Sequence, residues 1–177
     1  MAVEHILGHS ASMRWIGDPT PFTARAGAQI GRRPLRALVV DDNDGNRQLL
    51  SAILRSQDLE VDIASCGETA VEAARQTAFD LILMDLNMPN MDGLTATRLI
   101  RQQESAQAGR RTKIVIVSSQ GAASDMARSR AAGADQHITK PVDLAALIDL
   151  VERRQRAALV ESCLRWLKGR LMAGARA

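Results

Sequence analysis

The stretch Asp80 to Gly93, which reads DLILMDLNMPNMDG, organises the rest of the chain. It begins with an apolar run, Leu81 to Met84, and such a run between polar residues is typical of a strand buried on both faces of a parallel sheet. Asp85 follows directly, at the carboxyl edge of the sheet, where open α/β folds place their ligand sites. The turn-forming residues after it predict a loop before the next helix. Taken alone, Asp85 is equally well explained as a helix cap.

A second apolar run also ends in acid. Leu38 to Val40 precede Asp41 and Asp42, so two buried strands are expected to deliver three carboxylates to one edge of the sheet. Carboxylates held close together raise one another's pKa unless a cation neutralises them. Because hard divalent cations prefer oxygen ligands, the sequence predicts a Mg²⁺ site at this edge.

Two further runs bring a hydroxyl and an ammonium to the same edge. Ile114 to Val117 lead into Ser118, and Gln136 to Thr139 lead into Lys140. Taken alone, Ser118 is more often a helix cap and Lys140 more often a surface lysine. Their position beside three predicted carboxylates is what makes them candidates for a functional site.

Strands and helices alternate along the central part of the chain. Apolar runs predict strands at about 35–40, 81–84 and 114–117, and shorter strands are predicted at about 58–64 and 137–139. Apolar spacings of three and four predict helices at about 46–56, 68–76, 91–104 and 124–132, followed by a last helix that Asp143 caps. This alternation predicts an α/β fold with a doubly wound, five-stranded parallel sheet and helices on both faces.

These residues, in this order, resemble the receiver domain of two-component response regulators over about residues 35–152. The resemblance rests on the acidic pair, the DLNMPNMDG loop, the serine that closes IVIVS and the lysine of ITKP, which are Asp41, Asp42, Asp85, Ser118 and Lys140. The family has a flavodoxin-like strand order, 2-1-3-4-5, in which the first and third strands are neighbours at the switch point. The resemblance therefore implies that the three carboxylates lie together.

The resemblance also implies a role for each residue in phosphoryl transfer. Asp85 would be the phosphoacceptor, Lys140 would pair with a phosphoryl oxygen, and Ser118 would donate its hydroxyl to another. His137 holds the position where the family often has an aromatic switch residue, so the predicted switch consists of His137 and Ser118. An imidazole titrates near neutral pH, which departs from the family's pattern.

The implied cofactor is Mg²⁺. By resemblance, the ion would be held by Asp42, Asp85 and the backbone carbonyl of Asn87, while Asp41 would act through bound water.

The implied function is a phosphoryl-accepting signalling switch of a two-component phosphorelay that acts by protein contact. The expected partners are a histidine kinase or a histidine phosphotransfer protein as donor, and an unknown protein downstream. A receiver fragment of a hybrid histidine kinase is an alternative, because the loop after Asp85 resembles those receivers too. A Mg²⁺-dependent aspartyl-phosphate phosphatase is a weaker one, since Asn87 stands where such enzymes need a second carboxylate. We therefore expect no enzyme, but at most self-phosphorylation from small donors and slow autodephosphorylation.

Charge and hydropathy separate an acidic centre from basic ends. Residues 37–150 carry 16 acidic and 11 basic groups, whereas residues 151–177 carry two acidic and seven basic groups. No stretch approaches the ~18 apolar residues of a membrane-spanning helix, and the N-terminus lacks an apolar signal core, so we expect a cytoplasmic protein.

The two ends are expected to differ from the receiver domain at 35–152. Residues 1–34 are rich in glycine and proline and are predicted to be a disordered leader. Residues 153–177 are predicted to be a basic amphipathic helical extension, too short for a DNA-binding domain with its own core. The last helix of the domain is expected to continue into this extension with one apolar stripe, opposed by basic residues that include Arg154; the stripe consists of Val151, Leu159, Val160, Cys163, Leu164, Leu167 and Leu171. We expect this stripe to dock on its own domain or across a symmetric homodimer.

Overall fold

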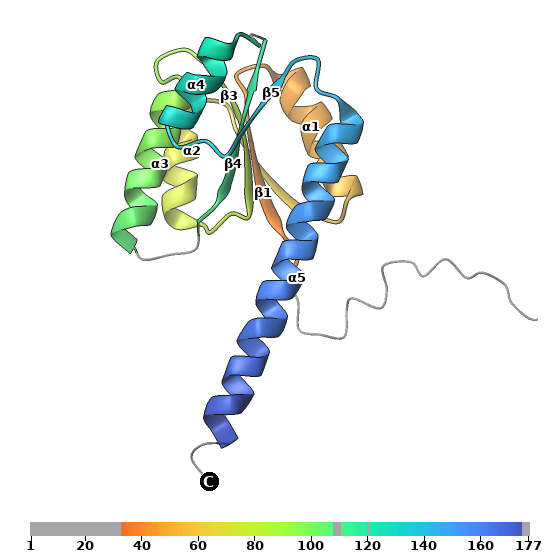
Figure 1. Cartoon of the computed structure of the whole chain (residues 1–177). Coiled ribbons are helices and arrows are strands. Elements are labelled where there is room, and N and C mark those ends of the chain that lie inside the picture. The colour runs from red at the N-terminus through yellow and green to blue at the C-terminus, as the bar shows by residue number, and fades with distance from the viewer. Residues whose placement is uncertain (1–32, 108–110, 120, 175–177) are drawn as a thin grey trace, which may run out of the picture. The chain divides into compact units, whose positions relative to one another are not determined.

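A computed structural model describes residues 33–107, 111–119 and 121–174, and in it strands and helices alternate as predicted (Figure 1). The elements are β1 (Arg36–Val40), α1 (Asp44–Ser56), β2 (Glu60–Ala64), α2 (Gly67–Gln76), β3 (Leu81–Asp85), α3 (Gly93–Gln107), β4 (Lys113–Ser118), α4 (Ala123–Ala131), β5 (Gln136–Thr139) and α5 (Leu144–Gly174). Each predicted element is present, with ends that differ by a few residues.

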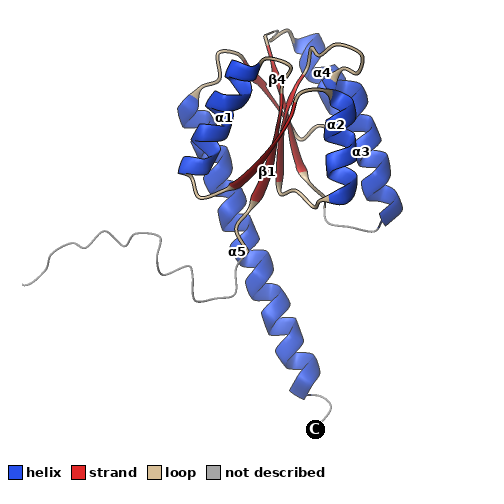
Figure 2. Cartoon of the chain, turned by 180° about the vertical axis from the view of Figure 1, so that it is seen from behind, coloured by secondary structure: helices blue, strands red, loops and turns tan. Residues whose placement is uncertain are grey.

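The five strands form one parallel sheet in the order β2-β1-β3-β4-β5. The chain therefore turns back at β1 and β3, which are neighbours in the sheet although β2 lies between them in sequence. Helices α1 and α5 cover one face, and α2, α3 and α4 cover the other (Figure 2). The predicted α/β class, strand order and two-sided covering are confirmed.

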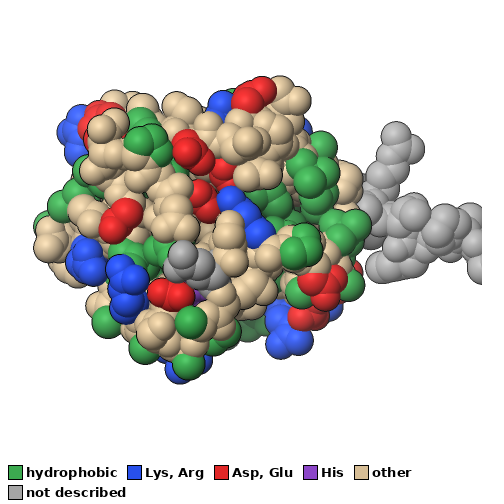
Figure 3. Space-filling view, turned by 90° about the horizontal axis from the view of Figure 1, so that it is seen from above, with side chains coloured by type: hydrophobic (Ala, Val, Ile, Leu, Met, Phe, Trp, Pro, Cys, Tyr) green, Lys and Arg blue, Asp and Glu red, His purple; other side chains and the backbone are tan. Residues whose placement is uncertain are grey.

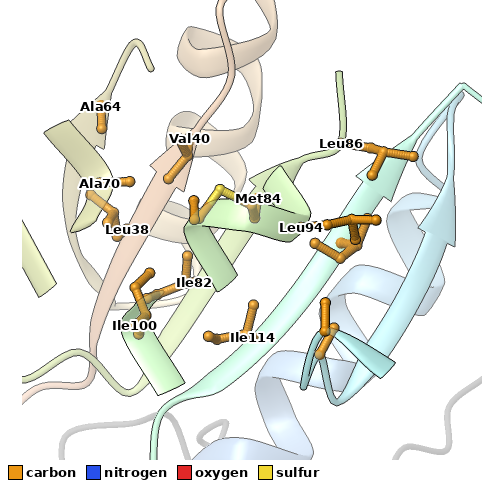
Figure 4. Close-up of a cluster of buried hydrophobic side chains, with 14 of the residues drawn as sticks. Leu38, Val40, Ala64, Ala70, Ile82, Met84, Leu86, Leu94, Ile100 and Ile114 are labelled. Atoms are coloured by element: carbon orange, nitrogen blue, oxygen red, sulfur yellow. The ribbon is translucent and has the colours of Figure 1, made fainter. Parts of the chain in front are cut away.

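Each face of the sheet has its own apolar core, because successive side chains of a strand point to opposite faces. The core under α2 and α3 includes Leu38, Val40, Ile82, Met84, Leu94 and Ile100 (Figure 4). The core under α1 and α5 includes Val39, Leu83, Val115, Leu50, Leu54 and Leu147. Each such side chain contributes about 1.5 to 3 kcal/mol when fully buried. The strands that carry the predicted site residues are thus held from both sides.

Helix α5 spans 31 residues, and among its described side chains those that pack on the domain lie in its first half. Leu147 and Val151 are buried and Ala158 packs against the core, but Val160 and Leu164 are 59% and 52% exposed. Beyond this point the helix leaves the sheet (Figure 1). Docking of the extension on its own domain is therefore wrong for Val160 and Leu164.

The expected place of Arg154 on the basic outer face of α5 is also wrong. Its side chain is 13% exposed, and its Nε donates to the carbonyl oxygen of Asp80 at 3.1 Å. One guanidinium nitrogen of Arg154 lies 3.8 Å from the Asp80 carboxylate. The spacing of charges along one helix could not reveal this buried partner, which lies 74 residues earlier in the chain.

Parts of the predicted ends fall outside the described residues. These are residues 1–32 of the predicted leader and the last three residues of the extension, while the side chains of residues 165–174, Leu167 and Leu171 among them, are not described either. Helix α5 runs without a break across residue 152, the predicted end of the receiver domain. Among the described helices, none contains a stretch both long and apolar enough to cross a membrane.

Candidate functional site

Three carboxylates meet where β1 and β3 end, at the switch point of the sheet. Asp41 follows β1 and is 1% exposed, Asp85 ends β3 and is 5% exposed, and Asp42 is exposed. One oxygen of each carboxylate lies within 4.8 Å of the other two. Seen from this edge of the sheet, acidic side chains gather near the centre of the face beside basic ones (Figure 3). The topology therefore brings the three acids together as the strand order implied.

Lys140 reaches two of these carboxylates from the loop after β5. Its Nζ lies 2.8 Å from Oδ2 of Asp41 and 2.7 Å from Oδ1 of Asp85. The backbone N–H of Lys140 also donates to the carbonyl oxygen of Ser118 at 2.7 Å, which ties the ends of β5 and β4 together. Ser118 itself is fully buried at the end of β4. Four strands thus bring predicted site residues to one edge of the sheet.

The site holds more negative than positive charge. Burial raises the pKa of Asp85 above its ordinary value, Lys140 opposes this rise, and Asp41 and Asp42 add to it. Burial alone would lower the pKa of Lys140, but the carboxylates of Asp41 and Asp85 outweigh it and raise that pKa. Because one ammonium serves two buried carboxylates, the lysine is held charged while Asp85 remains incompletely neutralised.

The donor set fits a divalent cation. Mg²⁺ binds oxygen ligands and is commonly held by one or two carboxylates with several waters. The carboxylates of Asp42 and Asp85 lie within reach of one ion. Asn87, two residues after Asp85, is exposed in the loop, and the role of its carbonyl as a ligand stays a prediction.

Two residues in the first turns of α1 fix the acidic loop and were missed by the sequence analysis. Nδ2 of Asn46 lies 3.1 Å from both carboxylate oxygens of Asp41. Nη1 of Arg47 donates to the carbonyl oxygens of Asp41 and Asp42, at 2.7 and 3.0 Å. The available signal was their place directly after the acidic pair, in the first turns of a predicted helix. Asn46 holds a side chain of the site, and Arg47 holds its backbone.

The alternative role of Asp85 as a helix cap is not the one that the structure gives it. The cap of α3 is Asp92, whose Oδ1 accepts a hydrogen bond from the N–H of Thr95 at 2.6 Å. The start of α3 passes so close to β3 that a Cβ on Gly93 would lie 2.1 Å from the carbonyl oxygen of Asp85. A glycine is therefore required there, and the carboxylate of Asp85 faces Lys140 instead of the helix.

His137 contacts α4 through its ring. Its Nδ1 lies 2.9 Å from Oγ of Ser129, and that hydroxyl donates to the carbonyl oxygen of Asp125 at 2.8 Å. The hydroxyl of Ser129 thus links the ring of His137 to the backbone of α4. The predicted role of His137 in a switch stays a prediction, now with α4 as the element it contacts.

The chain belongs to the response regulator receiver domain family, whose model matches residues 37–152. The predicted resemblance is thereby confirmed, and the domain is a regulatory module of two-component phosphorelay signalling.

Curated relatives of the chain include large sensor kinases. It is 35% identical over 133 residues to the sensor protein GacS of Pseudomonas syringae pv. syringae, a match covering 75% of this chain and 15% of GacS. It is 34% identical over 128 residues to the histidine-protein kinase BarA of Escherichia coli, covering 72% of this chain and 14% of BarA. The chain thus spans about a seventh of the length of these relatives.

Solved structures of receiver domains are similar in fold. The receiver domain of the sensor histidine kinase PA1611 from Pseudomonas aeruginosa, which has a magnesium ion in its active site cleft, is 33% identical with a TM-score of 0.61. That match covers 68% of this chain and 97% of the other. The receiver domain of Ssk1 from Saccharomyces cerevisiae, crystallised with the histidine phosphotransfer protein Ypd1, is 28% identical with a TM-score of 0.62, over 64% of this chain and 83% of the other.

Proposed function

We propose that this domain is a signalling switch that accepts a phosphoryl group on Asp85 with Mg²⁺ bound at the same edge of the sheet. The observation that carries the proposal is the sharing of Lys140 between two buried carboxylates, at 2.8 Å from Asp41 and 2.7 Å from Asp85. A site with three acids and one lysine has an excess of negative charge. A bound cation can supply the missing positive charge, and Lys140 can turn from the carboxylates to an incoming phosphoryl group.

The chemistry needs one nucleophile and positive charge around the moving group. A carboxylate oxygen of Asp85 attacks phosphorus, and the bond from phosphorus to the donor breaks. The leaving acetate or imidazole keeps the electron pair, and Asp85 becomes an acyl phosphate. Lys140 then pairs with a phosphoryl oxygen, and the Ser118 hydroxyl donates to another. When bound, Mg²⁺ supplies further positive charge to the phosphoryl oxygens.

Mg²⁺ is assigned to Asp42, Asp85 and the backbone carbonyl of Asn87. Asp41 is assigned a role through bound water, because both of its carboxylate oxygens already accept hydrogen bonds from Asn46. Its Oδ2 also contacts Lys140.

The donor is a phosphohistidine on a histidine kinase or a histidine phosphotransfer protein, and the output is contact with another protein. Support comes from the similar Ssk1 receiver, which was crystallised with such a phosphotransfer protein. The short matches to GacS and BarA favour, as a second arrangement, a receiver that works as the relay portion of a hybrid kinase. Both arrangements use the same chemistry at Asp85.

The test is incorporation of phosphate from acetyl phosphate, measured as a hydroxylamine-sensitive label on the full chain. We expect labelling with Mg²⁺, little after chelation, and none in Asp85→Asn. The matched control is Asp149→Asn, because Asp149 is an exposed acid paired with Arg153 on α5. Labelling of Asp85→Asn at the parent's rate would overturn the assignment.

A second test separates acceptance of the phosphoryl group from the response to it. Lys140→Ala is expected to retain part of the labelling, because Asp85 and the metal ligands remain. It should lose the change in amide hydrogen exchange at Ser118 and Ser119 that phosphorylation causes in the parent. A normal exchange response in phosphorylated Lys140→Ala would show that Lys140 does not couple the site to the end of β4.

A further inference from the structure

Helix α5 carries an apolar seam on the face that points away from the domain. The face that packs on the domain includes Val151 and Ala158. Ala157, Val160 and Leu164 are all exposed, the last two by 59% and 52%. Each residue turns the helix by about 100°, which puts Val160 about 160° and Leu164 about 120° around the helix from Ala158. The seam therefore lies on the far side of the helix from the sheet.

The spacing of this seam is that of a coiled coil. Ala157, Val160 and Leu164 are separated by three and then four residues, and the sequence continues with Leu167 and Leu171 at the same alternating spacing. Such an alternation is the a and d pattern of helices that pair with one another. The backbone of α5 is helical through Gly174, so the helix extends past all five positions.

The seam cannot turn toward its own domain, because two contacts fix the rotation of α5. Arg154 donates from Nε to the carbonyl oxygen of Asp80 at 3.1 Å. Gln155 donates from Nε2 to the carbonyl oxygen of Gln57 at 2.8 Å. Both contacts hold the opposite face of the helix against the core. Whatever covers the seam must come from outside this domain.

We propose that the seam pairs in parallel with α5 of a second copy of this chain. In such a pair, Arg156 and Glu161 flank the seam on opposite sides and are five residues apart, which is the spacing of ion pairs between parallel helices. Within one copy, Arg156 lies 3.3 Å from Glu152 and Glu161 lies 3.5 Å from Arg154, so the pair between copies adds to these contacts along the helix. Arg156 of each copy then lies beside Glu161 of the other, so two-fold symmetry forms the attractive pair twice. One heptad before Ala157 the same line of the helix reaches Leu150, which is buried in its own domain, so the pairing begins at Ala157 and involves the half of α5 that follows it.

The pairing is short, and it depends on concentration. The seam covers about two heptads, and isolated helices of that length are marginal in water. Here the helix is already started by the packed residues of α5, such as Leu147 and Val151, so pairing does not need to nucleate it. The expected behaviour is a reversible monomer–dimer equilibrium.

The first experiment is sedimentation equilibrium of the full chain over a concentration series. We expect a reversible dimer in the parent and at least a tenfold weaker one in Leu164→Asp. The matched control is Leu159→Asp, one residue off the seam, with thermal unfolding of each variant to confirm that the domain is intact. A parent that is monomeric at every concentration would overturn the proposal, and so would a Leu164→Asp dimer of unchanged strength.

Two further variants test the parallel arrangement. Arg156→Glu should weaken the dimer by opposing Glu161, and the double variant Arg156→Glu with Glu161→Arg should restore it. Val160→Cys, in a chain whose free thiols are removed by Cys66→Ser and Cys163→Ser, should oxidise to a covalent dimer. If the charge-exchanged variant stays as weak as Arg156→Glu, or Val160→Cys forms no disulfide at a concentration where sedimentation shows a dimer, the parallel pairing is wrong.

Discussion

Two buried acids flank strand β3, and their surroundings differ. Asp80 precedes the strand and is fully buried, while Asp85 ends it and is 5% exposed. The carboxylate of Asp80 accepts hydrogen bonds from Arg33 at 3.0 and 3.3 Å and from the backbone N–H of Arg36 at 3.0 Å. The guanidinium of Arg154 lies 3.8 Å away. The carboxylate of Asp85 contacts Lys140, which it shares with Asp41.

The comparison of Asp80 with Asp85 shows that burial alone does not mark a functional carboxylate. Desolvation of a charge is costly at either end of the strand, and it is offset where enough cations and N–H groups face the charge. Asp80 is compensated in this way, by Arg33, by the N–H of Arg36 and by Arg154. Its carboxylate therefore connects the segment before β1 with α5. At Asp85 the compensation is incomplete, the pKa of the carboxyl is raised, and the site can gain from a cation and a phosphoryl group.

The largest stability effect is expected for Asp80→Asn, which removes the charge and keeps the shape. Arg154, whose side chain is 13% exposed, then loses one acidic partner and keeps Glu161 at 3.5 Å, while Arg33 and the N–H of Arg36 face a neutral amide, so the free energy of unfolding should fall by about 2 kcal/mol. Urea unfolding measures this loss. Labelling of Asp85 should continue, because the two acids are about 16 Å apart along the strand. An unchanged free energy of unfolding would mean that the charge of Asp80 makes no net contribution to stability.

An Asp→Asn substitution at the other end of β3, at Asp85, is expected to stabilise the fold at pH 7 instead of destabilising it. The pKa of Asp85 is raised in the folded state, so its contribution to stability is complete below the unfolded pKa of about 3.9 and is lost as pH rises through the folded value. At pH 7 the ionised carboxylate therefore destabilises the fold. Asp85→Asn should therefore raise Tm at pH 7 without Mg²⁺, because the asparagine removes the charge that burial disfavours.

The dependence of this Tm difference on pH and on Mg²⁺ tests whether the charge of Asp85 causes it. The difference in Tm between Asp85→Asn and the parent should narrow as pH falls toward 4, and also when Mg²⁺ stabilises the parent. A variant that is less stable than the parent at pH 7 would contradict incomplete compensation at Asp85.

A smaller effect is expected for Asn46→Ala, which removes the amide that holds the Asp41 carboxylate. Loss of such a hydrogen bond costs about 1 kcal/mol, so Mg²⁺ should bind roughly fivefold more weakly by calorimetry. The control is Gln48→Ala, which removes an exposed hydrogen bond to Asp44 in the same helix. Equal Mg²⁺ affinity in both variants would mean that the hydrogen bonds from Asn46 to Asp41 do not contribute to Mg²⁺ binding.

The sequence predicted the surroundings of Asp85, at the carboxyl end of β3, better than the surroundings of Asp80, which precedes the strand. Asp41 and Asp85 each directly follow an apolar run, Lys140 directly follows the short stretch Gln136 to Thr139, and the order of a doubly wound sheet then places them at one edge. The surroundings of Asp80 depend instead on contacts between residues 47 and 74 positions apart, which no local pattern encodes. For that reason the position of Arg154 was wrongly predicted.

Within the site, the sequence identified the charged groups but not what holds them. Asn46 and Arg47 are ordinary polar residues of a helix until the turn after β1 brings them back onto the acidic pair. His137 was identified by position, but its partner Ser129 lies on the preceding helix α4 and could not be inferred from periodicity.

Of the buried acids around β3, Asp85 is the one that we propose as the phosphoacceptor. The most direct measurement is phosphorylation of the full chain by acetyl phosphate with Mg²⁺, followed by borohydride reduction and mass spectrometry of its peptides. Reduction converts an aspartyl phosphate to homoserine, so the modified position is read directly. We predict homoserine at position 85, with Asp41 and Asp80 unchanged. Homoserine at Asp41 or Asp80, or none at position 85 in a chain that has taken up phosphate, would contradict this account.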